Sequence, residues 1–491
     1  MRNIVVLLAA STFLAACSTQ KYEPGPEVAL TDTYKNRTGR RGETINPETK
    51  WWANFGDKNL NSLIEEALAS NLSIEAARER VHAAQLTSRI ANSAYLPQID
   101  KVASATVAGN YDKHQVKVGT TRNPLTGQKV PVTRRKWEAT DTSSATKGLN
   151  GTWVINPLAW KSTKERELER IAAEREALYA ARLDIIAAVA NAYVSAQGYG
   201  RQAQIAKSAL SVQNETSEIT IAKVEAGSAS TLDSTRAKAN AALTSADIPV
   251  LEQAREQFVN QIATLLGKTP AELDSIFTRY KAVRLPRERF KEGIPADLLR
   301  NRPDIRQQER LLAAAVADIG VAESDLWPSL TLSGNLGLSR TQASGTTANW
   351  AFGPSVNLPI FDRGALKAGV NLSKSAARQQ YLAYRQTVIE AVRQVEDAMV
   401  ALRQEQIRYS RLSTAVSELT RAEQLARELN NAGTTEFKDV LDAQAASYSA
   451  QLQLADSQLQ LNINYILLCQ ALGGGWGGEE AEAYEVVVVK K

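Results

Sequence analysis

An internal duplication constrains the fold of this 491-residue chain more than any other feature of its sequence. Residues 74–99 align without gaps with residues 305–330, at an offset of 231 positions. Residues 226–267 align with residues 432–473, at an offset of 206 positions. Because the matching segments occur in the same order, the sequence predicts two copies of one structural unit. The predicted copies are residues 60–267 and 296–473.

Each copy is predicted to form a helix, two strands, a very long helix, a turn and a returning helix. In the second copy, strands at about 328–339 and 350–359 alternate apolar residues with small polar ones. Strands of about ten residues with this alternation are typical of transmembrane β-barrels, although a soluble sandwich is an alternative. The strands of the first copy, at about 98–109 and 147–156, are less regular.

The strand count has a consequence for assembly. Four strands cannot close a barrel, and an open sheet edge is not viable in lipid. The barrel must therefore be shared between chains, with eight strands for two chains or twelve for three. The alternation alone does not choose between these numbers.

The helices differ in length in a regular way. Residues 161–226 and 363–431 are predicted to form helices of about 100 Å. The other helices are about half as long, so one returning helix stacked on one leading helix would match one long helix. These shorter helices are predicted at about 60–95, 230–266, 296–326 and 435–472. The joints would then lie at mid-length, where the segments 17–59, 268–295 and 474–491 are predicted to form an equatorial belt.

The chain start has the features of a lipoprotein signal. Residues 1–16 combine a charged start with an apolar run, which predicts a secretory signal peptide. Leu14-Ala15-Ala16-Cys17 resembles the bacterial lipobox, so Cys17 is expected to carry N-palmitoyl and S-diacylglycerol groups. An ordinary cleaved signal with a chance cysteine is the alternative. Residues 17–59 would tether the lipid to the belt.

Several functions are not supported by the sequence. Lys and Arg number 58 against 53 Asp and Glu, so nothing suggests a nucleic-acid partner. The two histidines lack metal-ligand spacing, and no nucleotide loop or serine elbow occurs, so neither an enzyme nor a cofactor is expected. No run of 18 or more apolar residues suggests a transmembrane helix. Residues 111–146 are polar and basic and are expected to form an external loop, either solvated or touching glycolipid phosphates.

The duplicated unit resembles the TolC-like outer membrane factors, and four motifs besides the lipobox resemble the NodT-type lipoprotein branch that serves RND-type efflux pumps. These motifs are Trp51-Trp52-x-x-Phe55-x-Asp57-x-x-Leu60, Arg302-Pro303-Asp304-Ile305, Leu358-Pro359-Ile360-Phe361-Asp362-x-Gly364 and Ala471-Leu472-Gly473-Gly474-Gly475-Trp476. The resemblance covers nearly the whole mature chain.

The resemblance implies a mainly α protein with a membrane β-barrel. It implies a homotrimer with a shared 12-strand β-barrel and a long periplasmic α-barrel, anchored in outer membrane lipid. Its partners would be a periplasmic membrane-fusion adaptor and an inner-membrane RND pump, and its function would be passive exit of drugs or other small toxic compounds. A duct for type I protein secretion or metal-ion efflux is one alternative, and a coiled-coil structural lipoprotein without a pore is another.

The resemblance also implies which residues act. The adaptor-contact tips would be Ala226, Gly227, Ser228, Ala432, Gly433 and Thr434. Asp439 and Asp442 match two aspartates that line the periplasmic aperture, and only this second, inner hairpin has both, since Arg236 stands where Asp442 would be expected in the first copy. Alternatively, Asp439 favours the helix start and Asp442 is simply solvated. Relatives that latch the aperture carry tyrosine and arginine where this chain has Asn430 and Thr435.

Overall fold

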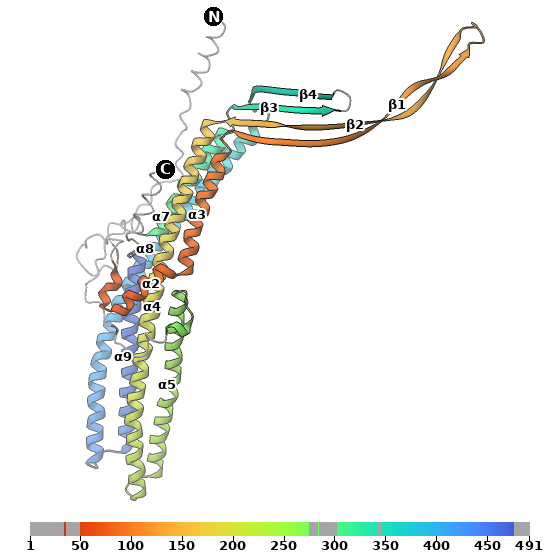
Figure 1. The fold of residues 1–491 in the computed structure, drawn as a ribbon. Coiled ribbons are helices and arrows are strands. Elements are labelled where there is room, and N and C mark those ends of the chain that lie inside the picture. Colours follow the sequence, from red (N-terminus) through yellow and green to blue (C-terminus); the bar gives the residue numbers. More distant parts are fainter. Residues whose placement is uncertain (1–33, 36–49, 274–282, 284–301, 342–344, 476–491) are drawn as a thin grey trace. The chain divides into compact units, whose positions relative to one another are not determined.

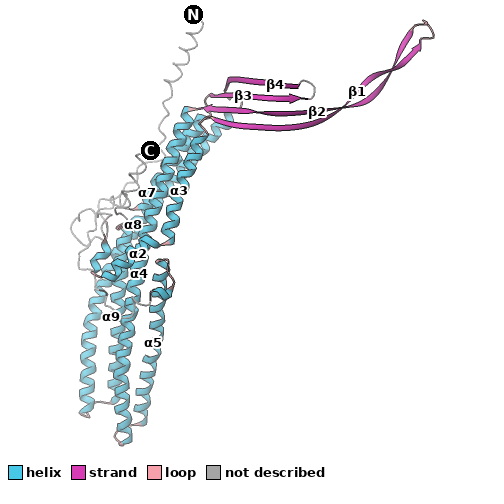
Figure 2. Cartoon of the chain, viewed as in Figure 1, coloured by secondary structure: helices cyan, strands magenta, loops and turns pink. Residues whose placement is uncertain are grey.

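The computed structural model describes residues 34–35, 50–273, 283, 302–341 and 345–475. This part of the chain is mainly helical and carries one four-stranded antiparallel sheet (Figure 2). Cys17, the signal peptide and most of the three predicted belt segments lie outside the described residues. The described chain divides into two compact units, one built from residues 86–168 and 314–377, and the other from the remainder.

The elements of the two copies match in order and in length. In both copies a helix of 22 residues, a long helix of 69 residues and a returning helix of 35 residues follow one another, with two strands after the first helix. In the first copy these helices are α3 (Leu72–Ser93), α4 (Pro157–Glu225) and α5 (Thr231–Leu265), and in the second α7 (Pro303–Ser324), α8 (Arg363–Asn431) and α9 (Phe437–Ala471) (Figure 1). The helix lengths therefore preserve the duplication seen in the sequence.

The single leading helix predicted at about 60–95 is in fact two helices, α2 (Lys58–Ser70) and α3, separated by Asn71. Asn71 is extended (φ −69°, ψ 125°), and its side-chain oxygen accepts bonds from the Ser73 and Ile74 backbone amides, which caps α3. Its amide group also donates to the Leu265 carbonyl oxygen at 2.7 Å. The break lets the chain turn where it meets the end of α5.

The predicted end-to-end stacking of helices is present in both copies. Ser70 donates to the Leu266 carbonyl oxygen at 2.8 Å, so the end of α5 meets the start of α3. In the second copy, Arg302 donates to the Ala471 carbonyl oxygen at 2.9 Å, so the end of α9 meets the start of α7. Each contact satisfies a carbonyl group that the end of a helix would otherwise leave without a partner.

The sheet has the order β1-β2-β3-β4, with every neighbouring pair antiparallel. The strands are β1 (Gln98–Arg122), β2 (Lys129–Ile155), β3 (Ser329–Thr341) and β4 (Gly345–Asn357). Leu336 lies opposite Leu149 on β2 and Trp350 on β4, whereas Asn335 lies opposite Asn150. Because paired residues share a face, β3 and β4 have one apolar face and one mainly polar face, which confirms the alternation predicted for the second copy. In the first copy, Lys101 and Lys147 lie on the same face as these leucines.

Residues 111–146 do not form the predicted loop, because β1 continues to Arg122 and β2 begins at Lys129. The charged residues of this segment are interspersed with valines and threonines, whose β-branched side chains favour strands. The real turn is short and ends at Gly127, which has φ +66° and donates to the Asn123 carbonyl oxygen at 2.9 Å.

The largest core of the second unit joins the N-terminal motif to the middle of α4 and the ends of α5 and α9. Trp51, Trp52 and Phe55 are each at most 5% exposed in this core. The Trp51 indole donates to the Gly474 carbonyl oxygen at 3.0 Å. An added Cβ on Gly475 would lie 2.8 Å from Trp51 Nε1. The two aromatic residues and the glycine-rich end of α9 therefore fit together as one joint.

Asp57 fixes the same joint through a buried polar contact. The Tyr193 hydroxyl donates to Asp57 Oδ2 at 2.9 Å, and both residues are nearly inaccessible. Burial is the largest cause that raises the pKa of Tyr193, so its hydroxyl stays protonated and remains a donor. Asp57 also accepts from the Asn59 backbone amide at 3.0 Å, which caps α2.

Among the described helices, α4 contains a stretch that is long and apolar enough to cross a membrane by length and composition alone. However, 56% of that stretch is buried inside the chain. The middle of α4 supplies Val189 and Tyr193 to the core, each with no exposed surface. Packing within the chain is therefore sufficient to explain its apolar composition.

Candidate functional site

The two helical hairpins end in turns of the same geometry. Gly227 and Gly433 both have φ +72°, which is the left-handed conformation that glycine adopts without strain. In the first turn, the backbone amides of Gly227 and Ser228 donate to the carbonyl oxygens of Val224 and Lys223, each at 2.9 Å. The second turn has the same two bonds at equivalent positions, so both hairpins end in a Schellman motif.

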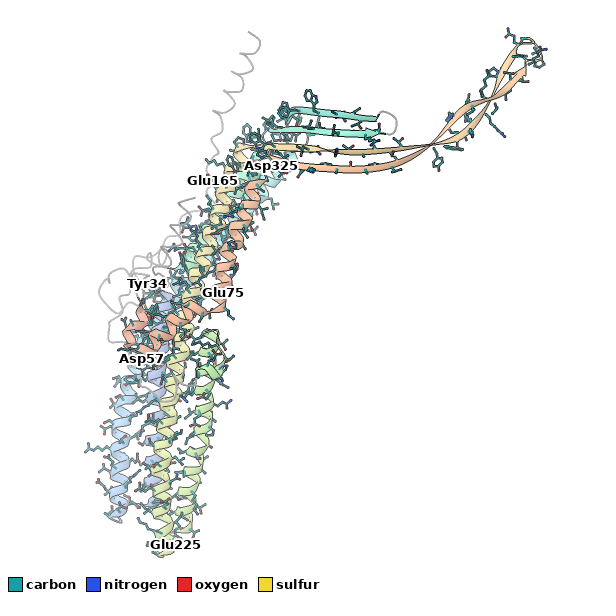
Figure 3. All side chains as sticks on the ribbon, in the orientation of Figure 1. Tyr34, Asp57, Glu75, Glu165, Glu225 and Asp325 are labelled. Carbon is teal, nitrogen blue, oxygen red and sulfur yellow. The ribbon has the colours of Figure 1, made fainter. Side chains whose placement is uncertain are left out.

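The six predicted tip residues are all exposed in the described chain, as expected for a contact surface. The three in each hairpin directly follow the long helix, whose last residue in the first copy is Glu225 (Figure 3). Short side chains at the tips leave backbone atoms accessible. This geometry is compatible with docking of another protein.

The two returning helices begin differently, although Asp233 and Asp439 occupy equivalent positions. In α5, Ser230 and Asp233 form a capping box, in which the Asp233 carboxylate accepts from the Ser230 backbone amide at 3.4 Å. In α9, the N-cap residue is Glu436, which makes no side-chain cap bond. Asp233 is therefore engaged in capping its helix, whereas the Asp439 side chain is exposed at the start of α9.

Asp439 and Asp442 project from the exposed side of α9, while Val440 and Leu441 between them are buried. Within the chain, Asp442 Oδ2 forms an ion pair with the Lys438 ammonium one helical turn earlier. This hydrogen bond is the largest cause that raises the pKa of Lys438, and Asp439 raises it further. Residues 436–442 contain three carboxylates and one ammonium group, which leaves a net charge of −2.

Lys438 was not recognised from the sequence as part of this cluster. The signal was available, because a lysine four residues before an aspartate is a common ion-pair spacing on a helix. The structure also assigns a role to Asn430, whose amide donates to the Thr435 carbonyl oxygen at 3.0 Å. This bond closes the turn locally.

The hairpins contact one another below the tips through polar side chains. The Gln444 amide on α9 donates to Thr216 Oγ1 on α4 at 3.0 Å, and the Tyr448 hydroxyl donates to Asp247 on α5 at 3.0 Å. Burial is the largest cause that raises the pKa of Tyr448, which keeps this donor protonated. Polar contacts of this kind cost less to separate than a dry apolar core, so they suit helices that move past one another.

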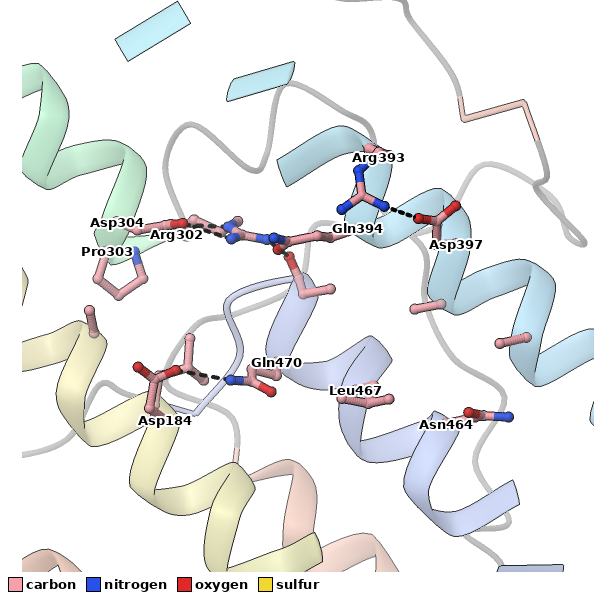
Figure 4. A pocket seen from close by; sticks show the side chains of 15 residues that line it. Asp184, Arg302, Pro303, Asp304, Arg393, Gln394, Asp397, Asn464, Leu467 and Gln470 are labelled. Carbon is pink, nitrogen blue, oxygen red and sulfur yellow. Dashed lines mark hydrogen bonds and ion pairs between the residues drawn. The ribbon is translucent and has the colours of Figure 1, made fainter. Parts of the chain in front are cut away.

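An open cleft of about 610 Å³ lies between α4, α7, α8 and α9 (Figure 4). Its wall contains Arg302, which binds the Asp304 carboxylate through two nitrogens at 2.7 and 3.0 Å. Asp184, also in the wall, accepts from the Gln470 amide at 2.9 Å, and burial raises the pKa of its carboxyl group. No group of side chains suited to a metal ion occurs among the described residues.

Long paired helices joined to a sheet with one apolar and one polar face define the class of TolC-like outer membrane channels. The outer-membrane channel OprN matches with a TM-score of 0.78 and 28% identity, over 93% of this chain and all of that one. The chain belongs to the outer membrane efflux protein family, whose model matches residues 63–268 and 294–474. It is accordingly an outer membrane protein with the fold predicted from its duplicated unit.

Relatives with assigned names agree with this family. Nodulation protein T of Rhizobium leguminosarum bv. viciae is 32% identical over 94% of this chain and 92% of its own length. The pyoverdine export outer membrane protein OpmQ of Pseudomonas aeruginosa is 28% identical over 97% of each chain. OpmQ is named as an outer membrane export protein, and neither relative is named as an enzyme.

Proposed function

We propose that this chain is the outer membrane exit duct of a tripartite RND-type efflux system, which conducts small toxic compounds or drugs passively. The observation that carries the proposal is the register of the sheet, which collects Leu149, Leu336 and Trp350 on one face and polar residues on the other. A sheet of this kind suits a wall with lipid on one side and water on the other.

The outer edges of β1 and β4 have no strand partner among the described residues. In lipid these edges require partners, because unpaired backbone groups cost several kcal/mol each. Three chains joined β1 to β4 would close a barrel of twelve strands. The homotrimer is therefore the assembly that fits both the sheet and the family.

The helical hairpins would form the periplasmic part of the duct. A helix of 69 residues is about 100 Å long, which suits a tunnel across the periplasm. The exposed tips, from Ala226 to Ser228 and from Ala432 to Thr434, would contact a membrane-fusion adaptor that links the duct to an inner-membrane RND pump. Pyoverdine export by the relative OpmQ supports small molecules as cargo.

Asp439 and Asp442 would line the aperture at the periplasmic end. The charge of −2 on residues 436–442 becomes −6 where three copies converge, which attracts cations into a narrow opening. The first hairpin lacks this cluster because Asp233 caps its own helix and Arg236 replaces the second aspartate. The Gly433 hairpin is thus the inner one, and the Gly227 hairpin lies outside it. Lipidation at Cys17 would add an anchor to the outer membrane.

Recordings from purified trimer in planar bilayers test the duct. We expect cation-selective conductance from the wild type, and weaker cation selectivity after Asp439→Ala and Asp442→Ala, which remove the attracting charge from the proposed aperture. Glu418→Ala is a matched control, because it removes an exposed carboxylate from α8 away from the tip. A trimer that conducts in neither form contradicts the proposal.

The efflux role is tested in cells. Deletion of the gene should increase sensitivity to a panel of toxic compounds, and a plasmid copy should restore resistance. A restored strain with Gly227 and Gly433 both changed to Arg should stay sensitive if the tips dock an adaptor, although its trimer still reaches the membrane. Full resistance in that strain would contradict tip docking.

A further inference from the structure

The distal parts of β1 and β2 form a feature that conduction does not explain. β2 pairs with β3 only from Ser144 to Ile155, so the residues beyond form a ribbon of two strands. From position 108 to Arg122 this ribbon is about 50 Å long. An isolated two-stranded ribbon is only marginally stable in water. It is therefore expected to rest against another surface.

The ribbon tip, defined here as residues 113–136, carries seven Lys and Arg residues and no Asp or Glu. All seven are exposed, and none pairs with a carboxylate among the side chains that the structure describes. They are Lys113, Lys117, Arg122, Lys129, Arg134, Arg135 and Lys136. Asp112 and Glu138 flank the tip at its base, so residues 112–138 carry a net charge of +5, from seven cations and two carboxylates. An excess of one sign of charge favours an anionic partner.

The strand register shows how these charges are distributed. Arg135 lies opposite Gln115, and the next pair, Val116 and Arg134, lies on the opposite face of the ribbon. A register shift between Lys117 and Gly119 twists the strands further. Both faces therefore carry cations. This arrangement suits a ribbon surrounded by anionic groups better than one lying on a flat protein surface.

Aromatic residues mark the base of the cationic tip. Trp137 lies opposite Lys113, whose ammonium is 5.3 Å from the centre of the indole ring. Trp137 and Tyr111 are both well exposed. Tryptophan and tyrosine concentrate where a membrane meets water, and a less exposed tryptophan, Trp153, lies near the other end of β2.

The length of the four-stranded part of the sheet fits a bilayer. β2 pairs with β3 from Ser144 to Ile155, which is about 36–40 Å along a strand. With a barrel tilt of about 40°, this spans about 30 Å along the membrane normal. The hydrocarbon core of a bilayer is about 30 Å thick. The ribbon, including its cationic tip, therefore lies beyond the hydrocarbon core.

We propose that the ribbon tip binds the phosphate groups of the outer-leaflet glycolipid. The orientation rests on the proposed duct, since α3 and α4 both join the opposite end of these strands and would lie in the periplasm. Glycolipid phosphates and sugars would surround the ribbon on both faces, pair with its cations and supply the stabilising surface that the sheet does not. This binding is separate from conduction.

The direct test uses full-length trimer in detergent, with lipid A carrying both phosphates and the same lipid A after dephosphorylation. We expect native mass spectrometry to show the phosphorylated form retained at least about tenfold more tightly. The variant R134Q/R135Q/K136Q should lose about tenfold or more of that affinity, because each cation near an anionic membrane contributes a several-fold factor. The matched control K238Q/R411Q/R421Q removes three exposed cations from α5 and α8 and should bind as the wild type does.

The outcomes that overturn the proposal are distinct. Equal retention of the two lipid A forms, or equal loss in the control variant, excludes a specific phosphate site on the ribbon. Full displacement of lipid A by inorganic phosphate at equal phosphate concentration assigns the site to a free anion instead. The ribbon variant should still conduct in planar bilayers, so a failure of the duct proposal would be seen separately.

The orientation is tested in cells with Thr126→Cys at the turn, where the residue is exposed. A membrane-impermeant maleimide should label it on intact cells. Labelling only after the outer membrane is opened would place the ribbon on the periplasmic side and overturn glycolipid binding.

Discussion

Substitution of Gly475 by alanine should open the joint between the N-terminal tryptophans and the end of α9. Gly475 has φ +99°, where an L-residue costs about 1–2 kcal/mol. The added Cβ would also lie 2.8 Å from Trp51 Nε1 and 2.9 Å from Trp52 Cζ3. Overpacking of this kind costs about 1–3 kcal/mol. The joint should therefore lose about 2–5 kcal/mol of stability against local opening.

Cys469 reports this opening directly, because it is 2% exposed in the same core. Burial raises the pKa of its thiol, so it reacts only when the joint opens. A loss of 2 kcal/mol or more should accelerate labelling of Cys469 by a thiol reagent at least about 30-fold. The measurement is the labelling rate of folded trimer, corrected with a Cys469→Ser variant for any reaction at Cys17.

Gly433→Ala is the matched control. Gly433 also has positive φ, at +72°, but no atom lies within 4 Å of an added Cβ. It should weaken only its own turn and leave the labelling rate of Cys469 unchanged. If Gly475→Ala labels no faster than the wild type, or Gly433→Ala labels equally fast, the packing of the tryptophans on this glycine does not hold the joint closed.

Three further predictions follow from separate parts of the chain. Lys438→Gln removes the cation that pairs with Asp442, so the reversal potential of the duct should shift toward higher cation selectivity. An unchanged reversal potential would contradict the proposal that Asp442 lines the aperture. Leu336→Lys should reduce assembled trimer in the membrane, because a lysine on the lipid face costs about 2–4 kcal/mol at mid-membrane, whereas Asn335→Lys on the other face should assemble normally. Burial is the largest cause that raises the pKa of the Glu176 carboxyl group in the fold. As pH rises, this carboxyl group therefore loses its proton in the unfolded chain first. The loss of folding stability from the buried carboxylate is complete above the pKa of the folded state. Glu176→Gln should therefore raise the thermal midpoint near pH 7 but not near pH 4, and an equal gain at both would refute this linkage.

Much of the fold could be predicted because the duplication tests each element against its copy. Gly227 and Gly433 mark the same turn in both copies, and the alternation around Leu336 fixes the apolar face of the sheet. The sequence does not predict the extension of β1 to Arg122, because the polar composition of residues 111–146 indicates a loop. On a two-stranded ribbon both faces meet solvent or headgroups, so alternation disappears while β-branched residues still favour strand.

The break at Asn71 was missed for a different reason. The apolar period continues across it, and Asn71 ends α2 because its amide has a tertiary partner, the Leu265 carbonyl oxygen. Similarly, no local pattern shows that Trp51 rests on Gly475. Contacts between residues hundreds of positions apart are set by how the helices stack, and the sequence shows only that both motifs are present.

The comparison between copies is most informative at the hairpin tips. Both turns have the same glycine conformation and hydrogen bonds, so the backbone gives neither hairpin a distinct function. The difference is in the use of one aspartate. Asp233 accepts from the Ser230 amide and caps its helix, whereas Glu436 at the equivalent N-cap makes no side-chain bond.

Capping therefore stabilises the start of α5 but not the start of α9. Loss of a cap typically costs about 1 kcal/mol, so the first turn of α9 should open more easily than the first turn of α5. Asp439 remains exposed, and the helix that carries it is the less firmly held of the two at its first turn. The proposed gate needs a charged lining on an element that can move, and of the two hairpins only the second has both features.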